Sequence, residues 1–319
     1  MYRIGVDLGG TNIAAGIVNS DFKIIAKASV PTVVTEGPDK VSGDIAALCL
    51  KLCADNGISM QDIESVGIAS PGIANSADGV VEYANNLPFK NFPICDAVSK
   101  LTGIESVHVE NDANAAAWGE AIAGAAKGTS NSVMITLGTG VGGGVIIDNA
   151  VYSGFNFAGA ELGHIVIEHG GKQCSCGRKG CWEAYSSATG LVNMTKEKIA
   201  ECEKNGAPTL MTEIAAKYGK VNGRTAFMAM NSGDKAAKEV VDTYIRYLAC
   251  GIVNVISIFQ PEVISIGGGI SNEGQALIDL LLPLVKDRAY GGDLVKNTDI
   301  RIAKLGNDAG IVGAATLGM

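Results

Sequence analysis

The chain has 319 residues, 47% hydrophobic and 18% charged, so it is long and apolar enough to fold around its own core. This balance excludes a disordered chain and a coiled coil, and the 42 glycines follow no three-residue period, which excludes collagen. The 25 basic and 33 acidic residues give a net charge of −8, which argues against a dedicated nucleic-acid-binding protein, because such proteins present a basic face. Length alone predicts about two domains.

The apolar segments do not predict a membrane protein or a secreted one. The most apolar stretch, residues 247–259, contains Asn254 and Ser257 and is shorter than the roughly 20 apolar residues of a spanning helix. It therefore predicts a buried helix. Asp7 interrupts the only apolar run near the N-terminus, so that run does not predict a signal peptide. We expect a cytoplasmic protein with no membrane partner.

Hydrophobic spacing predicts an α/β protein. In chain order we expect strands at residues 2–6, 13–18, 65–69, 107–109, 132–137, 145–147, 263–266 and 301–304. The expected helices are residues 41–56, 113–126, 186–206, 234–259 and 273–285, with a small-residue helix from Gly310.

A unit of strand, glycine loop and strand occurs twice, about 130 residues apart. The repeat predicts two related α/β halves with a cleft between them. We expect the first to span residues 1–115 and the second residues 116–304. The C-terminal helix, about residues 305–319, is expected to pack back on one half, and we assign it to the first.

The first loop has the sequence Asp-Leu-Gly-Gly-Thr and lies between two strands. The Rossmann fingerprint and the Walker loop are excluded, because both need a helix directly after the glycines. A glycine hairpin can still bind phosphate through its closely approaching N–H groups, or it can be an ordinary turn. The candidate nucleotide-binding residues here are Asp7, Gly9, Gly10, Thr11 and Asn12, with Asp7 able to hold Mg²⁺ through water.

Two later glycine runs extend this pattern. The second loop, Gly138, Thr139 and Gly140, repeats the small residues and the threonine, so two hairpins can clamp a polyphosphate from both sides. The third run, Gly267, Gly268 and Gly269, follows a strand and precedes a helix, where glycine permits close approach of an adenosine. Each run alone is weak evidence; the ordered set of three is stronger.

A carboxylate and a cysteine cluster are the other candidate sites. Asp112, in Glu-Asn-Asp-Ala-Asn, is either a helix cap or the general base that phosphoryl transfer to a hydroxyl needs. His164, Cys174, Cys176 and Cys181 have the spacing H-x9-C-x-C-x4-C, and one imidazole with three thiolates suits a structural Zn²⁺. His169 is the competing histidine.

In this order, the strings DLGGT, ENDANAAA, LGTGVGGG, ELGH, CSCGRKGCWE and IGGG resemble the ROK family of sugar kinases and sugar-responsive repressors. The resemblance covers essentially the whole chain, and within the family it is strongest to the bacterial glucokinases. It implies the two-domain actin/Hsp70/hexokinase-like (ribonuclease H-like) fold, ATP with Mg²⁺, and a hexose in the interdomain cleft.

The resemblance also implies roles for individual residues. Asp112 matches the catalytic base and Asn111 its sugar-binding neighbour. The other expected sugar-binding residues are Glu161, His164, Glu183, Asn86 and Gly72. The resemblance favours His164 over His169 as the fourth zinc ligand. It further implies a dimer or tetramer acting on a small sugar and a nucleotide.

The expected activity is transfer of the γ-phosphoryl of ATP to the 6-hydroxyl of a hexose, D-glucose before others. The alternatives are a family kinase for N-acetylglucosamine, N-acetylmannosamine, fructose or allose, and a non-catalytic sugar-sensing repressor. Only six residues precede Asp7, and we therefore expect no helix-turn-helix domain. A chaperone or filament ATPase of the same fold is not expected to carry the cysteine cluster or Glu183.

Overall fold

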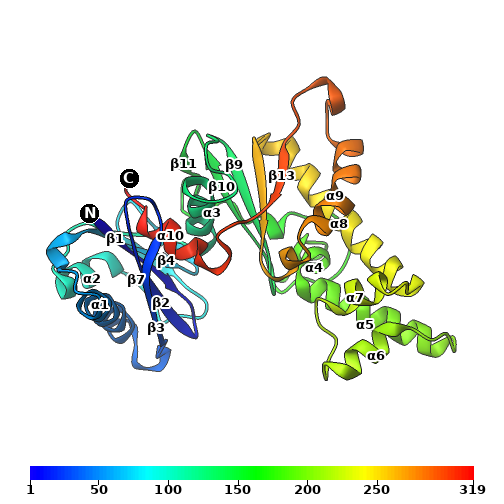
Figure 1. Ribbon diagram of the computed structural model, residues 1–319, viewed down its shortest axis with the longest axis horizontal. Coiled ribbons are helices and arrows are strands. Elements are labelled where there is room, and N and C mark those ends of the chain that lie inside the picture. Colours follow the sequence, from blue (N-terminus) through cyan, green and yellow to red (C-terminus); the bar gives the residue numbers. More distant parts are fainter. The chain divides into compact units, whose positions relative to one another are not determined.

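The computed structural model describes residues 1–319 and contains an α/β protein. Its strands are β1 (Tyr2–Leu8), β2 (Asn12–Val18), β3 (Ile24–Pro31), β4 (Ile63–Ser70), β5 (Ile73–Asn75), β6 (Val80–Tyr83), β7 (Lys90–Phe92), β8 (Val107–Asn111), β9 (Ser132–Leu137), β10 (Val141–Ile147), β11 (Ala150–Val151), β12 (Val263–Gly267) and β13 (Asp299–Ile302) (Figure 1).

The α-helices are α1 (Pro38–Asp55), α2 (Ile94–Thr102), α3 (Asp112–Ile122), α4 (Glu183–Ser186), α5 (Ala188–Lys204), α6 (Leu210–Lys217), α7 (Thr225–Asn231), α8 (Lys235–Phe259), α9 (Gln275–Arg288) and α10 (Ala309–Ala315). The predicted strand–loop–strand units are confirmed, since the first glycine loop joins β1 to β2 and the second joins β9 to β10. Strands β3, β5–β7 and β11 and helices α2, α4, α6 and α7 were not predicted.

The chain divides into two compact units. Unit 1 contains residues 1–134, 144–160 and 303–319, and unit 2 contains residues 135–143 and 161–302. The expected boundary after residue 115 falls inside α3, whereas all of α3 belongs to unit 1. The reason is packing: Gly119 of α3 and Gly313 of α10 let the two helices approach until backbone meets backbone.

Unit 1 is built on a five-stranded sheet of order β3-β2-β1-β4-β8. Strand β1 pairs antiparallel with β2 and parallel with β4, and β4 pairs parallel with β8. Alternate residues of a strand point to opposite faces. Ile4 and Val6 therefore share a core with Ile45 and Leu48 of α1, while Gly5 between them meets α10 on the other face.

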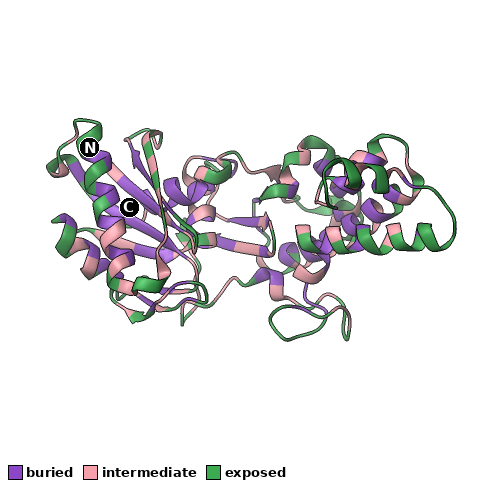
Figure 2. Cartoon of the chain, turned by 90° about the horizontal axis from the view of Figure 1, so that it is seen from below, coloured by how far each residue is buried: buried purple, intermediate pink, exposed green.

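The second five-stranded sheet has the order β11-β10-β9-β12-β13. This repeats the order of the first sheet, and β12 and β13 are parallel, as β4 and β8 are. The two halves are thus related in topology, as the repeated loops predicted. Figure 2 shows that buried residues follow the strands and the inward faces of the helices.

Unit 2 packs around the long helix α8. Trp182 is fully buried, and its indole N–H donates to the carbonyl of Tyr247 at 3.1 Å. Its ring occupies a notch in α8 at Gly251, where a Cβ would come within 2.0 Å of it. Glu183 follows Trp182 directly, so this buried anchor fixes the backbone beside a predicted site residue.

Helix α8 contains the apolar stretch that the sequence singled out. By length and composition alone it is the one helix of the structure able to cross a membrane. Half of its most apolar window is buried inside the structure, as in the core helix of a folded domain, so its composition is weak evidence for a membrane span.

Candidate active site

The first glycine loop is a tight hairpin held from one side by β3. The N–H of Gly9 donates to the carbonyl of Asn12 at 2.9 Å and closes the turn. Thr32 donates its hydroxyl to the carbonyl of Gly9 at 2.7 Å and its N–H to the carbonyl of Thr11 at 3.0 Å. Asn86 lies beside Gly10, where a Cβ would come within 3.2 Å of the Asn86 side chain. The exposed side chain of Thr11 leaves its hydroxyl available to a ligand.

Hydrogen bonds of the Asn111 side chain hold the motif at the start of α3. Asn111, not Asp112, is the N-cap: its Oδ1 accepts from the N–H groups of Ala113 at 2.9 Å and Asn114 at 3.2 Å. Its Nδ2 donates to the carbonyl of Gly72 at 3.0 Å. An amide nitrogen carries two hydrogens, so one remains for a ligand. The capping interpretation of Asp112 is therefore wrong by one residue.

Asp112 is the first residue of α3, and its Oδ1 accepts from the N–H of Ala113 at 2.8 Å. The residue is exposed. Even so, surrounding protein desolvates the carboxylate and raises the pKa of Asp112 above the usual aspartate value of 3.8, against hydrogen bonds that lower it. A carboxylate with a raised pKa is a better proton acceptor than an ordinary one.

Asp7, at the end of β1, is the neighbouring carboxylate in unit 1. Burial raises its pKa first, and the negative charge of Asp112 raises it further, while Lys27 lowers it. Gly310 of α10 lies against it, since a Cβ there would come within 3.2 Å of the carboxyl carbon. A carboxylate whose pKa is raised by a neighbouring carboxylate gains from a cation beside it, and carboxylate oxygens are donors that Mg²⁺ prefers.

The cysteine cluster of unit 2 comes together as the spacing predicted. The ligand atoms of His164, Cys174, Cys176 and Cys181 all lie within 4.8 Å of one another, and His169 is not among them. The Sγ atoms of Cys176 and Cys181 are 3.6 Å apart, and the Sγ of Cys174 is 3.8 Å from Nδ1 of His164. One imidazole and three sulfurs at this separation fit a tetrahedral Zn²⁺.

Two features of the loop favour metal binding. Gly177 and Gly180 have φ values of 87° and 85°, in the left-handed region, and they let the chain wrap around the cluster. Hydrogen bonds from Arg178 lower the pKa of the Cys176 thiol to about 6. The thiolate is the form that binds a metal ion.

Glu183 joins this cluster to the second glycine loop. Its Oε2 accepts from the N–H of Val141 at 3.0 Å, and its Oε1 accepts from the hydroxyl of Ser175 at 3.2 Å. The thiol of Cys174 lies 3.6 Å from the same Oε1. Gly140 lies against this side chain, since a Cβ there would come within 2.3 Å of the Glu183 carboxylate and displace it. Glu161 precedes the 3₁₀ turn Leu162–His164 and is exposed.

The third glycine run borders a cavity of about 360 Å³ in unit 2. Gly268 has a φ of 82°, and a Cβ there would come within 2.6 Å of the backbone of Leu137. The sequence missed most of the lining, which includes Tyr218, Asn222, Arg224, Met228 and Glu273. These residues follow no motif, so only the fold could bring them to the glycines.

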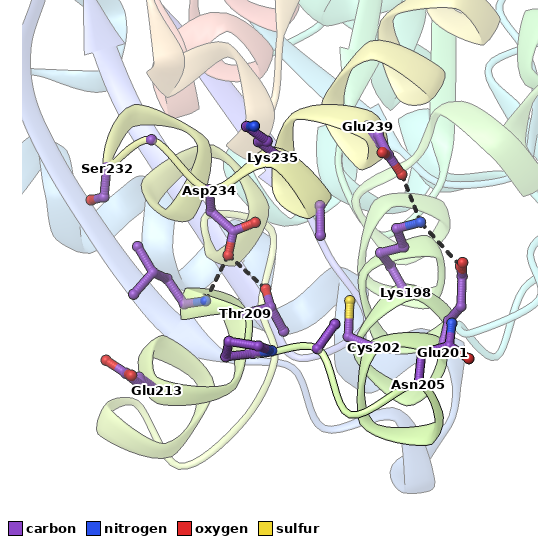
Figure 3. Close-up of a pocket in the computed structure, with 15 residues that line it drawn as sticks. Lys198, Glu201, Cys202, Asn205, Thr209, Glu213, Ser232, Asp234, Lys235 and Glu239 are labelled. Atoms are coloured by element: carbon purple, nitrogen blue, oxygen red, sulfur yellow. Dashed lines mark hydrogen bonds and ion pairs between the residues drawn. The ribbon is translucent and has the colours of Figure 1, made fainter.

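A larger cavity of unit 2, of about 670 Å³, contains none of the predicted site residues (Figure 3). Asp234 dominates it and accepts from the hydroxyl of Thr209 at 2.7 Å and from the N–H of Leu210 at 2.6 Å. Its other oxygen accepts from the N–H of Ala237 and caps α8, whereas the N-cap of α6 is Thr209. Lys198 pairs with Glu201 and Glu239. Asp234 and Lys198 thus have their partners within the protein.

Comparison with known proteins agrees with the family that the glycine loops and the cysteine cluster resemble. Residues 3–319 match the model of the ROK family. The chain belongs to the ROK family. A glucokinase of Thermotoga maritima is 38% identical over 315 residues, which are 98% of this chain and 96% of that protein. An N-acetylmannosamine kinase of Citrobacter koseri is 29% identical over 99% of the chain and 98% of its own length.

The fold is shared with solved ROK structures. The ROK glucokinase of Streptomyces griseus, determined in complex with glucose and AMPPNP, is 34% identical, covers 99% of both chains and has a TM-score of 0.79. This ROK protein therefore has the α/β, two-domain actin/hexokinase-like fold that the motifs implied.

The predicted residues divide between the two units. Unit 1 holds Asp7, Gly9, Gly10, Thr11, Asn12, Gly72, Asn86, Asn111 and Asp112. Unit 2 holds Gly138, Thr139, Gly140, Glu161, His164, Cys174, Cys176, Cys181, Glu183, Gly267, Gly268 and Gly269. Within each unit, the hydrogen bonds and close contacts described above bring several of these residues together. That residues of both units act on the same substrates is part of the proposed function.

Proposed function

We propose that this ROK protein transfers the γ-phosphoryl group of ATP to the 6-hydroxyl of D-glucose, with Asp112 as the general base. The observation that carries the proposal is the Asn111–Asp112 pair at the start of α3, in a chain 38% identical to a glucokinase over nearly its full length. The Streptomyces griseus relative binds glucose and an ATP analogue, which supports both substrates.

In the proposed step, the oxygen of the 6-hydroxyl forms a bond to the γ-phosphorus, and the bond from that phosphorus to the β-phosphate oxygen breaks. The hydroxyl proton passes to Asp112, and ADP leaves. The raised pKa of Asp112 suits a group that must hold this proton. Asn111 keeps one amide hydrogen free for a sugar oxygen while its Oδ1 caps the helix. Glu161, His164, Glu183, Asn86 and Gly72 complete the proposed sugar-binding set.

The nucleotide is proposed to bind to the three glycine runs. The N–H groups of residues 10–12 and the hydroxyl of Thr11 are proposed to donate to phosphate oxygens, while the N–H of Gly9 closes the turn. In the second loop the N–H groups of Thr139 and Gly140 are proposed to do the same, since that of Gly138 donates to the carbonyl of Gly140. The adenosine takes the 360 Å³ cavity beside Gly269, where Arg224 and Tyr218 line the wall. Asp7 is proposed to hold Mg²⁺. Mg²⁺ bound there would neutralise phosphate charge.

His164, Cys174, Cys176 and Cys181 are proposed to hold Zn²⁺, because their donor atoms and separations fit a closed four-ligand site. Zn²⁺ there would act structurally. It would stabilise the loop from which His164 and Glu183 are presented, and it would not contact the phosphate.

An assay of ADP release tests the proposed function. The protein is supplied with Mg-ATP and, separately, glucose, mannose, fructose, allose, N-acetylglucosamine and N-acetylmannosamine. We expect the highest kcat/KM with glucose, and glucose 6-phosphate as the product by NMR. The 29% identical N-acetylmannosamine kinase makes preference for an acetylated sugar the second candidate. Turnover of no sugar by zinc-containing protein would contradict a hexose kinase.

A further inference from the structure

The Glu-Asn-Asp-Ala-Asn motif contains a carboxylate to which the proposed reaction assigns no part. Glu110 is the last residue but one of β8, and only 4% of its surface is exposed. Its Oε1 accepts from the N–H of Asn111 at 2.9 Å and from the Nδ2 of Asn114 at 3.0 Å. Carboxylates this deeply buried are rare in proteins unless they are paired. Glu110 therefore costs stability at a position where an apolar residue would suit a strand.

The two hydrogen bonds of Glu110 hold residues on either side of Asp112 in the chain. The bond to Asn111 fixes the peptide plane between β8 and the helix cap. The bond to Asn114 holds the first turn of α3 from its buried side, where Asn114 is 3% exposed. Asp112 lies between these two anchors. Its own carboxylate accepts from the N–H of Ala113.

The second oxygen of Glu110 has no hydrogen bond within the protein. The side chain lines a cavity of about 280 Å³ in unit 1, together with His108 and Trp118. Positioning thus depends on Oε1, the oxygen that accepts both hydrogen bonds. A glutamine at position 110 would keep the acceptor, whereas a leucine would leave the N–H of Asn111 and the amide of Asn114 without a partner.

We propose that Glu110 is a positioning residue for phosphoryl transfer: through Asn111 and Asn114 it fixes the orientation of Asp112 toward the attacking hydroxyl. This inference rests on the proposed function and deepens it. Reaction rates depend steeply on such orientation, since a misplacement of about 1 Å can cost about 100-fold in rate. Glu110 acts through its neighbours and contacts no substrate.

The test compares Glu110→Leu, Glu110→Gln and Asn114→Ala with the wild type. Glu120→Gln is the matched control, because Glu120 is a fully buried carboxylate on α3, the helix that begins at Asp112. Its carboxylate accepts from the N–H groups of Lys304 and Leu305 instead. For each protein, kcat per folded molecule, the KM values for ATP and glucose, the thermal midpoint and hydrogen exchange of residues 110–114 are measured.

We expect Glu110→Leu to lower kcat per folded molecule about 10- to 100-fold, with the KM for ATP changed less than about 2-fold. Exchange at the Asn111 amide should accelerate. Glu110→Gln should stay within about 3-fold of wild type, because its carbonyl oxygen accepts the same two bonds. Glu120→Gln should lower the midpoint and leave kcat per folded molecule unchanged. If Glu110→Leu does not fold, Asn114→Ala replaces it, with a smaller loss of kcat expected because the Asn111 bond remains.

A Glu110→Leu protein with unchanged kcat per folded molecule would overturn the inference, since Glu110 would then be structural only. Equal losses in Glu110→Gln and Glu110→Leu would also overturn it, because charge rather than the acceptor would matter. A wild type that phosphorylates no sugar would refute the proposed function, and the positioning role in that reaction would fall with it. Exchange at the Asn111 amide distinguishes the cases, because it reports the Glu110 contact without any turnover.

Discussion

The carboxylates of Asp7 and Asp112 set the electrostatics of unit 1, and both have raised pKa values. Desolvation is the first cause for each, and for Asp7 the charge of Asp112 adds to it. Ionised carboxylates in such surroundings are costly unless a cation joins them. The two carboxylates therefore lower the stability of the folded protein at a site proposed to act in catalysis.

The pH dependence of the reaction follows from Asp112. A general base must be deprotonated to accept the hydroxyl proton, so kcat/KM should rise with pH through the pKa of Asp112. Because that pKa is raised, the acidic limb should lie above 3.8, the value of an ordinary aspartate. Initial rates over a pH series, with Mg-ATP saturating, measure this limb. A rate already constant at the ordinary aspartate pKa would contradict the assignment.

Asp112→Asn should raise the thermal stability of the protein at neutral pH. A carboxyl whose pKa is raised by folding favours the folded state below its unfolded pKa, and it loses that contribution as pH rises through the folded pKa. At pH 7 the wild type therefore bears the cost of two neighbouring charges, and the variant bears one. Thermal melts should show a higher midpoint for the variant at pH 7 and a smaller difference as pH falls toward 3.8. A lower midpoint at pH 7 would contradict this electrostatic account.

At the scale of elements, α10 depends on glycines that only the fold explains. Gly5 of β1 and Gly67 of β4 lie where a Cβ would come within 1.8 and 1.7 Å of α10 carbonyl oxygens. Gly313 of α10 lies equally close to α3, where a Cβ would come within 1.7 Å of the carbonyl of Ala115. Helix α10 thus packs backbone to backbone on the sheet and on the helix that begins at Asp112.

Gly313→Ala should destabilise unit 1 by about 1–3 kcal/mol through overpacking, although alanine is the better helix former. Gly43→Ala is the matched control, since Gly43 lies in α1 and a Cβ there meets nothing within 4 Å. That change should stabilise the protein by about 0.5–1 kcal/mol. Denaturant melts of both variants measure the difference. Equal effects of the two substitutions would refute the close contact.

The sequence predicted most of the long helices and the strands beside the glycine loops, and it missed most of the shorter elements. It also missed β3, although that strand has eight residues of alternating exposure. The β1–β2 and β9–β10 hairpins were predicted because apolar runs flank their glycines. The three-residue strands β5 and β7 were missed, since so few residues carry no periodicity. Helices α6 and α7 were missed likewise, and Tyr218 and Arg224 of the proposed adenosine cavity with them. The start of α3 was displaced by one residue because Asn and Asp are equally good caps.

At the scale of the whole molecule, the two five-stranded sheets share one strand order, but the candidate residues of the two units differ in their chemistry. The base and the first phosphate loop are assigned to unit 1, and the cysteine cluster, Glu183 and the third glycine run to unit 2. Sequence spacing predicted the cysteine cluster correctly because its ligands are local, within 18 residues. The contact of Glu183 with Val141 was not predictable, because it joins residues 42 positions apart, whereas its contact with Ser175 is local.

Loss of the proposed zinc should weaken unit 2. Cys176→Ser removes an exposed ligand with little loss of packing, so its effect should report the metal rather than the core. We expect less than one Zn²⁺ per chain by elemental analysis and a thermal midpoint lower by more than about 5 °C. Cys250→Ser, at a half-buried cysteine outside the cluster, is the control and should keep its zinc. Unchanged zinc content in Cys176→Ser would refute the ligand set.

The central claim is that Asp112 takes the hydroxyl proton while ATP phosphorylates glucose. The most direct measurement is glucose-dependent ADP release by wild type and Asp112→Asn, with glucose binding to each measured by calorimetry. The account predicts rapid release by the wild type, and at least about a 100-fold lower kcat in the variant with glucose still bound. Turnover by Asp112→Asn near the wild-type rate would contradict it.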